Sequence, residues 1–402
     1  MKLKLDEIIL DYILYLKTNS EVPFSLLSGN CGIFLLVFLY FKNYSLDLSK
    51  YDVESLFLKS LTETFQNPPM NFTDGISGIG WMLQLLVKEE ILEYSEVTKV
   101  LDQIDSLSSQ FAIHSLRNGN HDFLYGAAGE MLYLQSRMNY NNKVKKSLIA
   151  ISDSLIDSSK NSVDGIYWQE SGFMLEDEQK NKEVSNLGIS HGQASKIVIL
   201  SKLVENGIEV ERYSKVLTEA VKFILSCKNK FTQNCFFPSI IENNVGQESA
   251  FWWSYGDLGI GIALYQAGRA LGNPEIIKEA ESIYHYYKNT KIEETGIFEA
   301  SLCRGTSGVA LMYHNMFLNT GIDAFRVTSD YWFDETLKLA KYSHDSDSIS
   351  GFKFLNNYST NRDEWFYQSN PGLLMGTAGV GLAMLSKLSG KKMAWSQCLL
   401  LN

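Results

Sequence analysis

The sequence has little of several features that mark special classes of protein. Its 402 residues include only five cysteines and six prolines, and its longest apolar run, residues 33–41, is too short to span a bilayer. A small, odd number of cysteines does not indicate a disulfide framework, so we expect reduced thiols and a cytoplasmic protein. The first residues do not have the layout of a secretory signal, because the acid Asp6 follows at once. Few prolines favour a helical chain.

Positive charge is also scarce. The chain has 36 Lys and Arg against 46 Asp and Glu, which gives a net charge of −10. A nucleic-acid-binding surface needs clustered basic side chains, so we expect no nucleic-acid partner. The hydrophobic share of 45% and the charged share of 20% are those of a globular protein with a large core. Since no linker divides the chain, we predict a single domain over residues 1–402.

A Gly-x-x-Gly turn followed by an apolar run recurs seven times along the chain. In the fourth copy Ser195 replaces the second glycine. One such turn means little, but seven in similar contexts predict one repeated architecture. Glycine allows a sharp turn and the close approach of a neighbouring helix. The copies begin at Gly29, Gly75, Gly126, Gly192, Gly256, Gly305 and Gly376.

The pattern of apolar residues predicts an all-α fold. The runs after the glycine turns are apolar on nearly every side, which is typical of buried helices. They alternate with amphipathic segments that predict helices with one face to water. We therefore predict an α/α toroid, a double-layered barrel of about seven inner and seven outer helices. The amphipathic segments are residues 5–16, 51–65, 97–113, 143–156, 213–225, 274–287 and 334–342.

The least helical segments are rich in glycine, asparagine, serine and aromatic residues. We predict that they form loops or short β-hairpins over the cavity, at the end of the barrel where the glycine turns gather. Loops over such an end commonly carry function. That end also holds the N-termini of the inner helices, which favour anions and thiolates. The segments are residues 164–185, 234–247, 291–302 and 343–368.

Four glycine turns carry side chains that can do chemistry. Asp122 lies four residues before Gly126, and the fourth turn contains His191-Gly192. The fifth turn reads Trp253-Ser254-Tyr255-Gly256, and the sixth reads Leu302-Cys303-Arg304-Gly305. Together they offer one imidazole, one thiol, one carboxylate and one guanidinium.

Through these motifs nearly the whole chain resembles the lanthionine synthetase C-like family, whose cyclases close thioether rings in lanthipeptides. The resemblance implies the α/α toroid fold. It also implies a catalytic zinc, which activates a substrate cysteine as a thiolate for addition to a dehydroalanine or dehydrobutyrine. In the family the zinc ligands are a cysteine in the fifth motif and a Cys-His pair in the sixth.

This sequence departs from that ligand pattern at two of three positions. Ser254 replaces the first cysteine, Arg304 replaces the histidine, and only Cys303 is kept; Ala250 also replaces an arginine of the family. Serine is a poor zinc ligand near neutral pH, and arginine stays protonated and cannot bind a metal. We therefore predict that the family's zinc is lost and that the protein has no cofactor. A second ligand set, Cys303 with His191 and Asp122, stays open.

The resemblance implies that His191 acts as a general acid or base. The residues themselves suggest that Cys303 is a thiol activated by the helix N-terminus and by Arg304 beside it, with His191 as its base and Asp122 to orient the imidazole. The expected substrate-binding residues are Tyr255, Arg304, Trp253 and Ser254. Plainer interpretations stay open: Cys303 as a small buried hydrophobe, His191 as a helix cap or hydrogen-bonded loop residue, Asp122 as a helix cap, and the two aromatic residues as packing. Arg304 would either neutralise Asp122 at the vacant metal position or bind a substrate carboxylate or phosphate.

Three functions follow as hypotheses. The first is a zinc-free relative of the cyclases that binds a dehydrated precursor peptide. Its further partners would be a dehydratase and an exporter of the same pathway. A complex with them would associate the protein peripherally with the membrane. The second is a metal-independent thioether cyclase, or another peptide-modifying enzyme, that uses His191, Asp122 and Cys303. The third is a carbohydrate-active α/α toroid enzyme with paired carboxylates. Its candidate acids are Asp164, Glu170, Asp257, Glu299, Asp363 and Glu364.

Overall fold

The computed structural model describes residues 1–19, 22–64, 69–170, 184–232, 234–356 and 362–402. These residues divide into two compact units, each built from separate stretches of the chain. Unit 1 consists of Met1–Pro69, Thr73–Glu93 and Lys288–Ala394, and unit 2 consists of Met70–Phe72, Tyr94–Tyr287 and Trp395–Asn402. A single domain over residues 1–402 stays a prediction.

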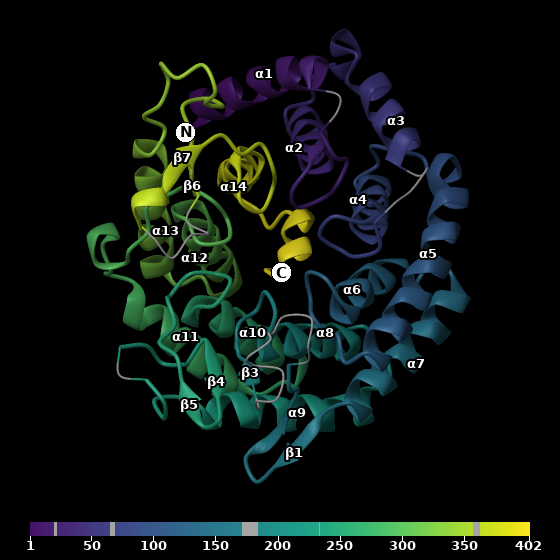
Figure 1. Ribbon diagram of the computed structural model, residues 1–402, viewed down its shortest axis with the longest axis vertical. Helices are drawn as coiled ribbons and strands as arrows, with labels where there is room; N and C mark the ends of the chain where they lie inside the picture. The colour runs from purple at the N-terminus through teal and green to yellow at the C-terminus, as the bar shows by residue number, and fades with distance from the viewer. Residues whose placement is uncertain (20–21, 65–68, 171–183, 233, 357–361) are drawn as a thin grey trace. The chain divides into compact units, whose positions relative to one another are not determined.

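Each glycine turn begins a buried helix, as the sequence predicts. The first glycine of every motif is the N-cap residue, and the apolar run after it is almost wholly buried. In unit 1, α14 packs against both α2 and α12, and in unit 2, α8 packs against both α6 and α10 (Figure 1). These helices are α2 (Asn30–Asn43), α4 (Ile76–Lys88), α6 (Ala127–Arg137), α8 (Gln193–Glu205), α10 (Asp257–Ala270), α12 (Thr306–Thr320) and α14 (Thr377–Ser389).

The glycines at these turns are required by space rather than by backbone conformation. The N-cap glycine Gly305 has a φ of −111°, which any residue can adopt. A Cβ atom at Gly305 would lie 2.2 Å from the backbone nitrogen of Ser301, and one at Gly308 would lie 2.0 Å from the carbonyl oxygen of Leu302. Both distances are far below a van der Waals contact, so only glycine fits against the turn.

Amphipathic helices pair with the buried ones. In unit 2, α10 packs against α11, α8 against α9, and α6 against both α5 and α7. In unit 1, α12 packs against α13, and α1 packs against α2 and α14. The sequence predicts a helix that overlaps each of the seven, which are α1 (Lys2–Thr18), α3 (Val53–Thr64), α5 (Tyr94–Arg117), α7 (Asn142–Asp157), α9 (Val210–Ser226), α11 (Pro274–Tyr287) and α13 (Asp323–Lys338).

The last of these differs from the expected span of residues 334–342. Helix α13 begins at Asp323 and ends at Lys338. Its first half contains the β-branched residues Val327 and Thr328, which have a low helix propensity. The ion pairs of Arg326 with Asp323 and Asp330 instead support its exposed face.

Short strands occur in three of the four segments expected to be loops or hairpins. Each strand pairs with its neighbour in antiparallel register. The segment 291–302 contains only the 3₁₀ turn η3 (Ile292–Glu294). Residues 171–183 and 357–361 of the expected loops lie outside the described residues. The strands are β1 (Lys160–Ser162), β2 (Gly165–Tyr167), β3 (Val184–Asn186), β4 (Ile240–Glu242), β5 (Val245–Gly246), β6 (Phe354–Asn356) and β7 (Phe366–Gln368).

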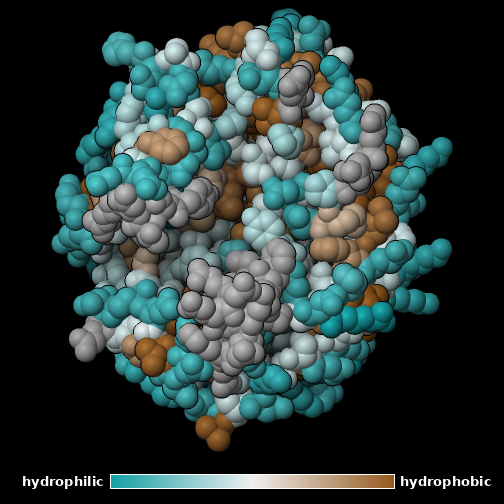
Figure 2. Space-filling view, viewed as in Figure 1, coloured by the Kyte–Doolittle hydropathy of each residue, from teal (hydrophilic) through white to brown (hydrophobic). Residues whose placement is uncertain are grey.

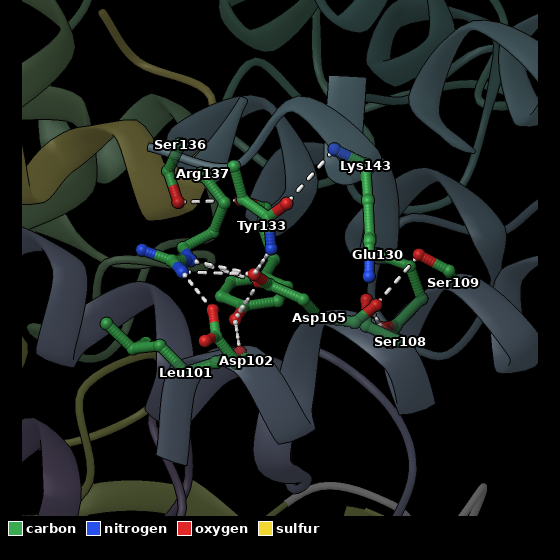
Figure 3. Close-up of polar contacts among 11 residues, drawn as sticks. Leu101, Asp102, Asp105, Ser108, Ser109, Glu130, Tyr133, Ser136, Arg137 and Lys143 are labelled. Atoms are coloured by element: carbon green, nitrogen blue, oxygen red, sulfur yellow. Dashed lines mark hydrogen bonds and ion pairs between the residues drawn. The ribbon is translucent and has the colours of Figure 1, made fainter. Parts of the chain in front are cut away.

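A buried ion pair joins α5 to α6 in unit 2. Arg137 is fully buried, and its Nε and Nη2 atoms each lie 3.0 Å from a carboxylate oxygen of Asp105 (Figure 3). The hydroxyl of Tyr133 donates to the same carboxylate at 2.6 Å. The rings of Tyr94 and Tyr140 each lie 5.8 Å from the guanidinium carbon. This arrangement compensates both buried charges with several hydrogen bonds.

The face of the molecule in Figure 2 carries mainly hydrophilic side chains, with separate hydrophobic ones between them. None of the helices among the described residues combines the length and the apolar character that crossing a membrane requires.

Candidate functional site

A buried histidine–aspartate pair lies at the glycine turns of unit 2. His191 Nδ1 lies 2.6 Å from Asp122 Oδ2, and the two residues are 9% and 1% exposed. A carboxylate accepts and the ring nitrogen donates, so the proton is assigned to Nδ1. In the neutral ring this leaves the lone pair on Nε2, the arrangement that a general base needs.

The turns themselves fix both members of the pair. The backbone nitrogen of Tyr125 donates to Asp122 Oδ1 at 2.7 Å, which leaves Oδ2 for His191. Asp122 is thus part of the turn before α6, although the N-cap residue of that helix is Gly126. On the other side, Gly192 donates to the carbonyl of Gly188 at 2.8 Å and closes the turn that carries His191. The carboxylate therefore has one structural oxygen and one oxygen that orients the imidazole.

Two tyrosines flank the imidazole. The ring of Tyr255 lies 5.6 Å from that of His191 between centroids, and the ring of Tyr125 lies 6.4 Å away in a stacked orientation. Both tyrosines are partly exposed. Tyr255 was expected at the site from the sequence, whereas Tyr125 was not, because no motif distinguishes it from other aromatic residues.

The other two residues of the fifth turn have structural contacts. Ser190 donates to the backbone carbonyl of Ser254 from both its nitrogen and its hydroxyl, at 3.3 and 3.1 Å. Trp253 is 1% exposed, and its indole N–H donates to the carbonyl of Leu399 at 2.9 Å. These contacts join the fourth and fifth turns and anchor the C-terminal segment. Roles of Trp253 and Ser254 in substrate binding stay predictions.

Three buried ionisable side chains lie around this pair: His121, Glu170 and Lys196. Burial, and to a smaller extent the charge of Lys196, lower the pKa of His121 to about 3. Lys196 is fully buried and donates to the carbonyl of His191 at 2.8 Å. Burial also raises the pKa of Glu170. A lysine inside the apolar run of the fourth motif is the signal that was available, since a buried lysine needs partners.

The sixth turn, in unit 1, carries Cys303 and Arg304. Cys303 is partly exposed, and its backbone nitrogen donates to the carbonyl of Leu374 at 3.2 Å. Arg304 Nε lies 3.1 Å from Glu299 Oε1, and its Nη2 donates to the carbonyl of Leu355 in β6 at 2.9 Å. Glu299 Oε2 accepts from the nitrogen of the same Leu355 at 2.9 Å. Within unit 1, the partner of Arg304 is therefore Glu299.

The donor set at the fifth and sixth turns does not fit the family's zinc. Of the three ligand positions only Cys303 carries a zinc-binding group, and the cation of Arg304 is held beside it by Glu299. A fixed guanidinium cannot bind a metal and repels a divalent ion. In the described part of the chain, no three His, Cys, Asp or Glu side chains are grouped as a metal ion would require. The loss of zinc itself stays a prediction, because it rests on donor chemistry.

Comparison with known proteins assigns the family. A model of the lanthionine synthetase C-like proteins matches residues 12–400. The chain belongs to this family. Among solved structures, nisin cyclase matches it with a TM-score of 0.77 and 19% identity, covering 100% of this chain and 97% of the cyclase. The lanthionine synthetase C-like chain therefore has the α/α toroid fold, as the sequence predicted. A search of curated proteins finds no match.

Three of the acids proposed for a carbohydrate-active enzyme bind other groups of the protein. Asp257 accepts from the backbone nitrogens of Phe236 and Phe237 at 2.7 and 3.0 Å, and burial raises its pKa to about 6. Glu299 pairs with Arg304, and Asp164 lies 3.8 Å from Lys230. With the family assigned, this third hypothesis loses its basis.

Proposed function

We propose that this protein binds a dehydrated precursor peptide and works without zinc, so that it is not a conventional zinc cyclase. Membership of the lanthionine synthetase C-like family supports the peptide as its partner. The serine at position 254 and the arginine at position 304 support the loss of the metal. Because of its family, we propose that its other partners are a dehydratase and an exporter of the same pathway. The protein would be cytoplasmic and would reach the membrane surface through its complex with them.

The His191–Asp122 pair favours a catalytic role in addition to binding. Its 2.6 Å contact orients the imidazole with Nε2 as the basic nitrogen. In the proposed reaction, Nε2 takes the proton from a cysteine thiol of the peptide, and the thiolate sulfur forms a bond to the β-carbon of a dehydroalanine. The electron pair of the carbon–carbon double bond moves to the α-carbon, which then takes the proton back from the imidazolium. One thioether bond forms, and no proton is gained or lost.

An activated alkene makes this reaction feasible without a metal. The base has to supply only a thiolate, and a general base contributes typically 10²–10⁴-fold to a rate. Cys303 is a second nucleophile in the chain, and we assign it no step in the thioether closure.

The test uses a synthetic peptide that contains one dehydroalanine and one cysteine. Binding is measured by fluorescence anisotropy with a labelled peptide, and ring closure by the loss of free thiol at unchanged peptide mass. We expect His191→Ala and Asp122→Asn to bind the peptide but to slow thiol loss at least about 100-fold. His114→Ala is the matched control, since His114 is an exposed histidine on α5 in the same unit.

Each result bears on one part of the proposal. Binding with no thiol loss in the wild-type protein would reject the catalytic role and leave the binding role. Thiol loss that His191→Ala leaves unchanged would assign the reaction to another group. The absence of any binding by the wild-type protein would reject the proposed function.

A further inference from the structure

Lys196 is buried in a place where a lysine is costly. It lies in the first turn of α8, between the buried residues Ser195 and Ile197, and it has no exposed surface. Its Nζ donates to the backbone carbonyl of His191 at 2.8 Å, so it reaches back to the turn that carries the imidazole. An ammonium ion in the protein interior must be compensated by negative charge.

Two buried carboxylates supply that compensation. Burial lowers the pKa of Lys196, while the charges of Glu170 and Asp122 act to raise it. Glu170 follows β2 and is 8% exposed, and its backbone nitrogen donates to the carbonyl of Val184 in β3 at 2.8 Å. Lys196 therefore lies in the field of one carboxylate that holds His191 and of another that comes from a different element.

Within the described part of the chain, two buried acceptor atoms near Lys196 lack hydrogen bonds. Among the described residues, Glu170 Oε1 and His121 Nδ1 are buried and have no hydrogen-bond partner. His121 Nε2 lies 2.9 Å from the carbonyl of Gln169, so Nε2 donates and Nδ1 is left with a lone pair in the neutral ring. Two unpaired acceptors thus lie in a cluster whose cation is Lys196. Buried unpaired acceptors need an explanation, and a fixed positive charge nearby supplies one.

We propose that Lys196 is a positioning residue of the His191–Asp122 pair, with Glu170 as its counter-charge. The ammonium group holds the carbonyl of His191, and its charge attracts the carboxylate of Asp122, which accepts from Nδ1. Lys196 thereby supplies, within unit 2, a fixed positive charge beside the imidazole–carboxylate pair. The use of Nε2 as a base rests on the proposed function, whereas the charge arrangement does not.

The net charge of the cluster explains why an apolar residue at position 196 would not position His191 equally well. With Lys196 present, the ionised cluster of Asp122, Glu170 and Lys196 carries one net negative charge. Without it, two buried carboxylates would face each other, and each charge disfavours the other. The added negative charge would favour binding of a proton, and the imidazole of His191 is the basic group in direct contact with Asp122. Methionine at position 196 would therefore convert His191 to the doubly protonated imidazolium.

Nitrogen NMR of the full-length chain labelled with ¹⁵N-histidine tests this at pH 7 without any peptide. We expect wild-type His191 to show a protonated Nδ1 and an unprotonated Nε2. In Lys196→Met the imidazolium form should increase several-fold, and the double variant Lys196→Met/Glu170→Gln should return to the wild-type pattern. Ser201→Ala is the matched control, because Ser201 is a buried residue of α8 that bonds to a backbone carbonyl in its own helix.

A wild-type ring with its proton on Nε2, or one already doubly protonated, would overturn the proposal even if the variants fail to fold. So would a Lys196→Met protein whose ring is the same as that of the wild type. A loss of the wild-type pattern that the double variant does not restore would indicate a packing role instead. Because no peptide is present, these outcomes are independent of the thiol-loss assay. The proposed function can therefore fail while this inference stands, and this inference can fail while the proposed function stands.

Discussion

Arg304 and Glu299 together bind the backbone carbonyl and the backbone nitrogen of Leu355. Arg304 donates to the carbonyl of Leu355, Glu299 accepts from its nitrogen, and the two side chains lie 3.1 Å apart. Glu299 is 3% exposed and also accepts from the hydroxyl of Ser301 at 2.7 Å. The position where relatives have a zinc-binding histidine thus holds a residue that attaches strand β6 to the sixth glycine turn.

This attachment predicts a local effect of mutation. In Arg304→Ala the buried carboxylate of Glu299 loses its ionic partner, and the carbonyl of Leu355 loses its donor. We expect hydrogen exchange at the amide of Leu355 to accelerate at least about tenfold, because about 1.4 kcal/mol corresponds to a factor of ten. Arg326→Ala, which removes an exposed ion pair of α13, should leave that exchange rate unchanged. Unchanged exchange in Arg304→Ala would show that the attachment does not hold β6.

Cys303 should be the first cysteine to react with an alkylating reagent. It is partly exposed, whereas the other four cysteines are buried. Burial raises the pKa of Cys227 to about 11 and raises that of Cys398 as well, so their thiolate forms are scarce. Peptide mapping after brief treatment with iodoacetamide should find the label at Cys303 and should find little in the Cys303→Ala protein. Equal labelling of Cys227 in the native protein would contradict this.

The buried pair of Arg137 and Asp105 should matter strongly for stability. Arg137→Met removes one partner and leaves a carboxylate in the interior, which typically costs about 3–5 kcal/mol. Chemical denaturation of the two proteins measures this difference. Arg326→Ala again serves as the control, since exposed pairs contribute little. A change well below about 1 kcal/mol for Arg137→Met would mean that water or a rearrangement compensates the carboxylate.

His121 should make the protein less stable as the pH falls. Its pKa of about 3 in the folded state lies below 6.5, the ordinary value, so the unfolded chain binds the proton more readily. Its contribution is complete above about pH 6.5 and is lost progressively toward pH 3. Between pH 7.5 and 5.8, which stays above the isoelectric point near 5.2, the wild type should lose about 1 kcal/mol more unfolding free energy than His121→Gln. Equal losses in both proteins would contradict the buried, neutral state of His121.

The helix starts could be predicted from the sequence because a local rule determines them. At six of the seven turns, all except that of Gly75, a Cβ atom on the first glycine would clash with its neighbours, so the pattern is visible without knowing the partner. The start of α13 was placed too late because its polar contacts, such as those of Arg326, depend on spacing along an exposed face rather than on apolar periodicity. The strands were expected only as loops or hairpins, since their registers join distant segments.

The site was predicted only where a motif carries it. Asp122, His191 and Tyr255 lie in recognisable signatures, and the structure brings their side chains together in unit 2. Lys196 and the pairing of Glu299 with Arg304 depend on which side chains meet after folding, and no spacing in the sequence reports that. Residues with unusual partners, such as a lysine in an apolar helix, are therefore the places to inspect first.

The central claim is that this family member works without zinc. The most direct measurement is the zinc content of the purified wild-type chain after saturation with zinc and removal of the excess, by mass spectrometry of the metal. The account predicts far less than one zinc per chain, and close to one in the double variant Ser254→Cys/Arg304→His, which restores the family's ligands. One tightly bound zinc per wild-type chain would contradict it.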